Sequence, residues 1–213
     1  MPSCFPSACF VGAAVLALAG CEGDFAAEPA ADGAGEGPPT AWVAEVDARL
    51  ADGARAFVER GEGWEATSPE TGLRGAFDAR GATLTGQGGQ IRVQTSGFGR
   101  EGSPAPVELG QPALGECSGR GVDPVGGCVR RLERAAGPLS EWWISTEAGF
   151  EQGWTVDSQP TGSGDLTIQV DVRGGRVSIV GDDVRIKGEN GRSWSVTGLV
   201  ATDAAGAKLP AWF

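Results

Sequence analysis

The 213-residue sequence predicts a mainly β protein: an antiparallel β-sandwich or a curled sheet and meander, with one short N-terminal helix. Three observations predict this class. Glycine is abundant, at 36 residues, and it divides the chain into short segments separated by turns. Apolar and polar residues alternate over much of the second half, which is the period of a half-buried strand. Helical spacing of apolar residues stands out in one stretch, near residue 45.

The first twenty residues have the features of an export signal. Phe10 to Ala19 is an apolar run of about ten residues, too short to cross a bilayer as a mature helix but typical of a signal-peptide h-region. The sequence Leu-Ala-Gly-Cys that ends at Cys21 resembles the lipobox of bacterial lipoproteins. The resemblance implies that residues 1–20 are cleaved off and that acylated Cys21 is the membrane anchor. The absence of Lys and Arg from residues 1–9 departs from the usual pattern.

The segment that follows predicts a tether and a location. Residues 22–40 contain five acidic residues and no basic ones, among Ala, Gly and Pro. Such a composition cannot bury enough apolar surface to fold, so we expect residues 21–40 to be an acidic flexible tether. Glu22 rather than Asp follows the anchor cysteine, which under the common sorting rule indicates the outer membrane or cell surface of the cell envelope.

Residues 41–213 are expected to form the β-rich domain, which begins with the helix. Trp42, Val43, Val46 and Leu50 recur at helical spacing, and Thr40 is placed as an N-cap. We predict a helix over residues 41–51, ended by Gly and able to extend to 59. The simplest interpretation of its apolar stripe is an ordinary helix that faces the core.

Period-two alternation predicts the strands. They are expected near residues 91–94, 166–172, 177–179, 184–186 and 194–196. Gly174-Gly175 and Asn190-Gly191 are placed as turns, and the second is a strong hairpin signal. We therefore predict an antiparallel meander from Leu166 onward. Two further segments, Asp78 to Gly81 and Asp203 to Gly206, each indicate a strand, an Asp-initiated turn and another strand.

A long irregular segment is expected at about residues 99–128. It is rich in Gly and Pro, and Cys117 and Cys128 lie toward its end. In an exported chain this even pair indicates a disulfide that ties down the loop. The alternative is two buried free thiols.

Composition excludes several classes of function. The chain has no histidine, which removes Ser-His-Asp triads, Cys-His pairs and His-containing zinc sites, and we expect no metal and no cofactor. The net charge of −11 argues against nucleic acid as a partner. Gly97 to Gly102 matches a dinucleotide-loop pattern, but Pro104 and Pro106 forbid the helix that such a loop needs.

Two residue types remain as candidates for a site. A carboxylate pair could support glycoside hydrolysis, and the candidates are Glu141, Glu147, Glu151, Asp157, Asp182 and Asp183. We expect these to be solvated surface charges rather than a catalytic pair, so no catalytic residue is assigned. Adjacent Trp142 and Trp143 should point to opposite faces of a strand, and with Trp154 they are candidates for contact with a sugar or a protein. Core packing is the alternative for all three.

Several stretches resemble one family. Gly137 to Trp143 with Gly149 to Val156, and the final Gly198 to Ala211, are similar to the N-terminal β-rich region of FG-GAP (integrin-alpha-like) repeat lipoproteins. The stretch from Gly72 also fits. The resemblance implies a cell-surface protein with no assigned chemistry in this region and a repeat domain beyond Phe213. We thus expect a non-enzymatic interaction or structural module, with a carbohydrate-binding or carbohydrate-active lipoprotein as the alternative.

Overall fold

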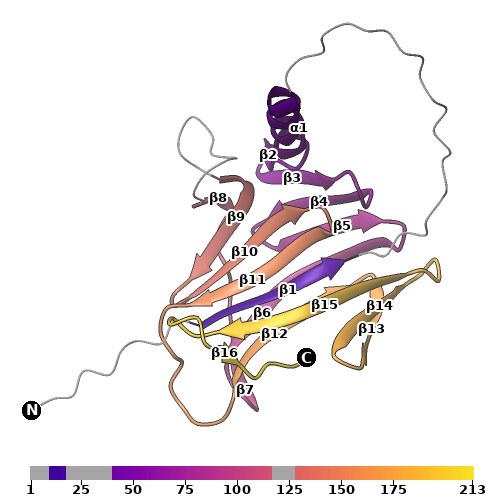
Figure 1. Cartoon of the computed structure of the whole chain (residues 1–213). Coiled ribbons are helices and arrows are strands. Elements are labelled where there is room, and N and C mark those ends of the chain that lie inside the picture. The colour runs from indigo at the N-terminus through magenta and orange to yellow at the C-terminus, as the bar shows by residue number, and fades with distance from the viewer. Residues whose placement is uncertain (1–9, 18–39, 117–127) are drawn as a thin grey trace, which may run out of the picture.

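The computed structural model describes residues 10–17, 40–116 and 128–213, and it confirms a mainly β protein with antiparallel sheets. Two sheets face each other, one of them curled, and one short helix, α1 (Thr40–Ala54), is found among the described residues. Figure 1 shows α1 standing beside β2, at the end of the sheets, rather than across their faces.

The first sheet has nine described strands in the order β13-β14-β15-β1-β11-β10-β9-β8, with β16 paired to β15. Their bounds are β1 Phe10–Ala17, β8 Ala113–Gly115, β9 Cys128–Ala136, β10 Leu139–Thr146, β11 Gly149–Val156, β13 Gly175–Val180, β14 Asp183–Gly188, β15 Ser193–Thr202 and β16 Lys208–Leu209.

The second sheet has seven described strands in the order β12-β6-β5-β4-β3-β2, with β7 paired to β6. Their bounds are β2 Val58–Arg60, β3 Gly63–Ser68, β4 Leu73–Asp78, β5 Gly81–Gly86, β6 Gly89–Arg100, β7 Ser103–Pro106 and β12 Leu166–Arg173.

The core lies between the sheets, where every second residue of the central strands points inward. In β4, for example, Leu73, Gly75 and Phe77 are buried while the residues between them are exposed. The buried apolar residues form two clusters. The larger contains Phe57, Ala66, Leu73, Phe77, Ala82, Leu84, Ile91, Val93, Leu132, Trp143, Phe150, Ile186 and Trp194. The smaller contains Phe98, Leu109, Leu139, Trp154 and Val156.

The predicted turns are confirmed where an Asp or Asn initiates them. The Asp78 carboxylate accepts a hydrogen bond from the Arg80 backbone N–H at 2.8 Å, between β4 and β5. Asp203 does the same for the N–H groups of Ala205 and Ala207 between β15 and β16. The hairpin at Asn190-Gly191 joins β14 to β15, as expected.

The meander prediction is wrong at its first turn. β12 pairs with β6 of the second sheet, so the chain crosses between sheets at Gly174 instead of making a hairpin. Gly174 has φ 85°, and a Cβ there would lie 2.5 Å from the backbone oxygen of Gln90. A glycine is therefore needed at 174, where the backbones approach closely at the crossover. Strands β13, β14 and β15 do form an antiparallel meander.

The core-facing interpretation of the helix is also wrong. Trp42, Val43 and Leu50 are 56%, 38% and 66% exposed. Val46, the fourth residue of the stripe, is half-buried, and the helix is followed by β2, the outermost strand of its sheet.

The described part of the segment at 99–128 is more regular than predicted. It contains the short strands β7 and β8, and Leu109 between them is buried in the smaller cluster. β7 includes Pro104 and Pro106, which confirms that no helix follows the Gly97 to Gly102 stretch.

The described part of the predicted h-region lies in a sheet. In the structure of the whole chain, Phe10–Ala17 is strand β1, between β11 and β15. Figure 1 shows it crossing the middle of the sheet in indigo. Removal of this segment by cleavage before Cys21 stays a prediction.

Candidate functional site

A buried carboxylate is the centre of the most elaborate polar cluster among the described residues. Glu141 lies in β10 and is fully buried. Its Oε1 accepts hydrogen bonds from Thr95 Oγ1 at 2.6 Å and from Gln152 Nε2 at 2.8 Å. Its Oε2 accepts one from Trp143 Nε1 at 3.1 Å and one from the Arg134 Nε. Both oxygens are thus saturated with donors.

Arg134 balances the charge of Glu141 and connects the two sheets. It lies in β9 directly opposite Glu141, and its side chain is 4% exposed. Its Nη1 donates to the backbone carbonyls of Asp78 and Ala79, both at 3.2 Å, in the β4–β5 turn of the other sheet. Since Thr95 is also in the other sheet, the ion pair has hydrogen bonds to both layers.

The network lies between the two apolar clusters. Trp143 belongs to the larger cluster and donates to Glu141, while Trp154 belongs to the smaller and donates to Thr95 Oγ1 at 2.9 Å. We name Thr95, Arg134, Glu141, Trp143, Gln152 and Trp154 the Glu141 network. It is a polar layer that divides the core.

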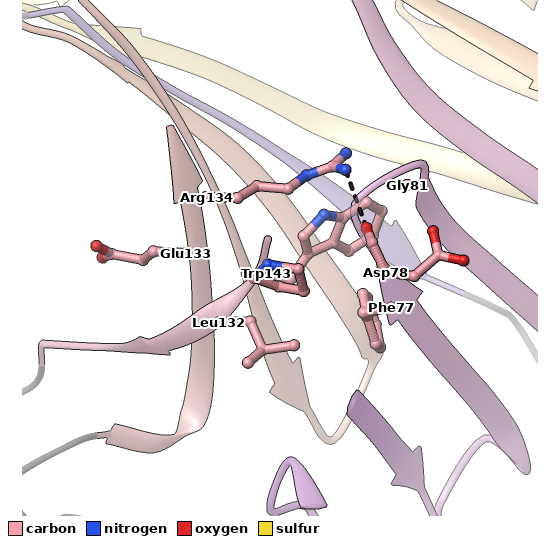
Figure 2. A pocket seen from close by; sticks show the side chains of 8 residues that line it. Phe77, Asp78, Gly81, Leu132, Glu133, Arg134 and Trp143 are labelled. Carbon is pink, nitrogen blue, oxygen red and sulfur yellow. Dashed lines mark hydrogen bonds between the residues drawn. The ribbon is translucent and has the colours of Figure 1, made fainter. Parts of the chain in front are cut away.

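A small cavity adjoins this layer. It measures about 10 Å³, which is about the room that one water molecule needs. It is lined by Phe77, Asp78, Gly81, Pro112, Leu132, Glu133, Arg134 and Trp143. Figure 2 shows the Arg134 guanidinium directed at the backbone carbonyl of Asp78, whereas the Glu133 carboxylate points away. The Arg134 Nη2 has no hydrogen-bond partner among the described residues.

The chemistry of the network is that of a structural polar cluster. Glu141 makes four hydrogen bonds to protein groups and faces an arginine, so its lone pairs and its charge are already used. A buried pair with this many partners links strands and sheets, and its energetic value depends on every partner staying in place.

The three candidate tryptophans are buried. Trp142, Trp143 and Trp154 are 5%, 2% and 7% exposed. Trp142 and Trp143 do point to opposite faces, since Trp143 is in the core and Trp142 lies over Gly153 on the other side, with the Arg131 guanidinium 4.6 Å above its ring. In this conformation none of the three indoles has a face open to a sugar or a protein.

The carboxylates proposed from the sequence are not brought together as one buried group. Glu147, Asp157, Asp182 and Asp183 are exposed and Glu151 is half-buried, as expected for solvated charges. For Glu141 the surface expectation is wrong, because it is the centre of the network described above.

Two carboxylates outside the network have pKa values below their ordinary ones. A hydrogen bond from Arg55 lowers the pKa of Glu70. Partial burial would raise the pKa of Asp78, but hydrogen bonds from the Arg80 backbone and from the side chains of Arg80 and Arg92 outweigh it and hold that pKa low. Their stabilising effect is therefore complete above the ordinary carboxyl pKa and is lost as the pH falls through the lower, folded value.

The cysteine predictions fall largely outside the described residues. Cys21 and Cys117 are not among them, and Cys128 is described only as the first backbone position of β9. The lipid anchor and the disulfide therefore stay predictions.

Two kinds of feature are not found among the described residues. No group of three or more Cys, Asp or Glu side chains able to hold a metal ion occurs in them. None of the helices they include is long and apolar enough to cross a membrane.

Comparison with known proteins finds no matching family, no matching curated protein and no matching solved structure. The resemblance to FG-GAP repeat lipoproteins thus stays a prediction from the sequence.

Proposed function

We propose that this chain is an exported lipoprotein, anchored to the cell envelope through Cys21, whose β domain binds a protein partner and performs no catalysis. The observation that carries the proposal is the outer strand β13. It pairs with β14 on one side, and no described strand pairs with its other side. Every residue from Arg176 to Val180 is exposed.

One face of this edge is apolar. Val177 and Ile179 are 47% and 60% exposed, and they lie opposite Ile186 and Val184 in the adjacent strand. Ile186 is buried in the core. Val177 and Ile179 thus lie on the same face of the sheet as the buried Ile186, but the second sheet does not cover them. An apolar edge strand with unpaired backbone groups is a surface that proteins normally cover.

The opposite face of the same hairpin carries three basic residues, with one acidic residue, Asp183, at its end. Arg176 and Lys187 are directly opposite each other, both exposed, and Arg185 lies on the same face two residues along. Like charges directly opposite are destabilising in a sheet. In a chain with a net charge of −11, this cluster favours an acidic partner. We therefore expect a partner strand that pairs with β13 and carries carboxylates beside apolar residues.

The membrane anchor is tested by replacing the acylated residue. Cys21→Ser removes the sulfur that must be acylated before cleavage, so the variant should accumulate as an unprocessed precursor and leave the detergent phase. The measurement is detergent partitioning of wild type and variant, with mass determination. A variant that partitions like wild type contradicts the lipoprotein proposal.

The partner surface is tested by cross-linking in cells. A photoreactive amino acid at Ile179 should give one adduct of defined mass, whereas the same residue at Glu62, an exposed position far along the other sheet, should not. Reversing the charges with Arg176→Glu and Lys187→Glu should abolish the adduct, because an acidic partner is then repelled. An adduct that survives the reversal contradicts the acidic-partner proposal, and no adduct at Ile179 contradicts the use of this edge.

A further inference from the structure

Strand β1 lies between two strands that do not pair with each other. Its residues pair antiparallel with β11, from Phe10 opposite Val156 to Ala17 opposite Gly149. On its other side it pairs antiparallel with β15, from Val11 opposite Thr202 to Val15 opposite Thr197, with an irregularity between. β11 and β15 therefore run parallel to each other, separated by one strand.

This strand is the segment that cleavage before Cys21 would remove, so the inference rests on the proposed function. Without β1, eight residues of β11 and the Thr197–Thr202 part of β15 lose a backbone partner in the middle of a sheet. Unpaired backbone groups inside a sheet are costly, and they favour pairing with another strand. We call the position between β11 and Thr197–Thr202 the acceptor site.

The two sides of the acceptor site are held in place by the core. On β11, Gln152 and Trp154 belong to the Glu141 network. On β15, Trp194 is fully buried in the larger apolar cluster. Direct pairing would require the strands to close a distance of about 9–10 Å, two strand spacings, to one spacing of about 4.8 Å. Packed cores do not deform continuously, so such a shift would break these contacts.

The acceptor site also specifies what fits. Gly153 of β11 is covered by the Trp142 ring, because a Cβ at Gly153 would lie 2.1 Å from Trp142 Cζ2. An incoming strand therefore needs a small residue opposite Gly153, and β1 has Ala13 there. The strand now seated, Phe-Val-Gly-Ala-Ala-Val-Leu-Ala, contains no charge. The composition of this strand therefore indicates the chemistry of the partner segment that would replace it.

We propose that the processed protein binds, between β11 and β15, an extended uncharged segment of another envelope protein, with small residues at its centre and antiparallel to β11. Main-chain hydrogen bonds on both sides supply the affinity of such strand addition. This site differs from the β13 edge, because the incoming strand becomes internal to the sheet.

The first measurement is the mass of the lipidated protein purified from membranes in detergent. Loss of residues 1–20 opens the acceptor site. Retention of these residues contradicts both the proposed function and this inference. With residues 1–20 absent, a failure to bind the probe below contradicts the acceptor site alone and leaves the lipoprotein proposal standing.

The probe is a synthetic peptide of residues 10–17, with two lysines added at each end for solubility. It should bind the processed protein, and its Ala13→Lys version should bind about 100-fold more weakly, because the longer, charged side chain would meet the Trp142 ring beside Gly153 and bring a second cation close to Arg131. Amide hydrogen exchange should be fast without peptide and slow with it at those N–H groups of 149–156 and 197–202 that point away from β10 and β16. Slow exchange before peptide is added means that the strands have closed on each other, which overturns the proposal.

A protein variant gives an independent test. In β15, residues 197–200 pair only with β1 among the described strands, since β14 pairs up to Val196 and β16 pairs from Ala201. Val200→Pro removes one N–H from this stretch without touching another ladder. We expect at least about tenfold weaker peptide binding with an unchanged circular dichroism spectrum. Equal binding by the variant and wild type, in a folded protein, overturns the proposal.

Discussion

Glu141→Gln should destabilise the protein by about 3–5 kcal/mol, the cost typical of removing one partner from a buried ion pair. The change keeps the size of the side chain but leaves the Arg134 guanidinium buried without its counter-charge. It also replaces one acceptor oxygen by an NH₂ group, which donates and cannot accept. Two of the four donors to Glu141 therefore lose their acceptor. The measurement is the free energy of unfolding from chemical denaturation.

Two comparisons isolate the ion pair. Glu62→Gln makes the same chemical change at an exposed position and should alter stability by less than about 0.5 kcal/mol. Combining Glu141→Gln with Arg134→Met removes the unpaired cation and should recover much of the loss, so the two changes should be strongly non-additive. Equal effects of Glu141→Gln and Glu62→Gln would contradict the view that Glu141 is a buried, paired carboxylate.

Trp194→Ala should cost about 3–5 kcal/mol, as large-to-small changes of buried aromatic residues do. Trp194 is fully buried and packs against Gly86 and Gly88, where an added Cβ would lie 3.1 Å and 2.3 Å from its ring atoms. Because both neighbours lack side chains, neither of them can move in to fill the space. The loss should appear in thermal and chemical unfolding alike.

The matched control for this change is Trp212→Ala. Trp212 is 67% exposed, so the same truncation should leave the stability nearly unchanged. A Trp194→Ala variant as stable as the Trp212→Ala variant would mean that Trp194 does not fill the core.

The sequence predicted those parts of the fold that depend on local signals. Period-two alternation located the strands of the β13–β15 meander, and the Asp turns at Asp78 and Asp203 have the predicted side-chain to backbone hydrogen bonds. Such turns depend on a few neighbouring residues, so a sequence shows them directly.

The predictions that failed depended on which strands pair. A Gly-Gly turn is compatible with a hairpin and with a crossover between sheets, and only the pairing of β12 with β6 decides between them. The apolar stripe on α1 is likewise equally compatible with a buried face and with an exposed one. Its position beyond the edge strand β2 is a property of the assembled sheet.

The Glu141 network could have been found from the alternation of β10. Leu139, Glu141 and Trp143 occupy every second position, so a core-facing Trp143 places Glu141 on the same inward face. The same holds for Arg134 in the run Leu132, Arg134, Ala136 of β9. Carboxylates are mostly exposed in proteins, which favours a surface position for Glu141. The alternation of its own strand predicts the buried position that the structure shows.

The direct opposition of Arg134 and Glu141 has a consequence for how the sheet assembles. If β9 slipped by two residues against β10, Glu141 would face Leu132 or Ala136 instead of Arg134, and both charges would be buried apart. A slip by one residue would send the arginine to the outer face. A shifted register changes the energy of apolar pairs little, whereas it separates this buried ion pair at a high cost in free energy. The charged pair therefore favours the native register of β9 against β10 over the misaligned ones.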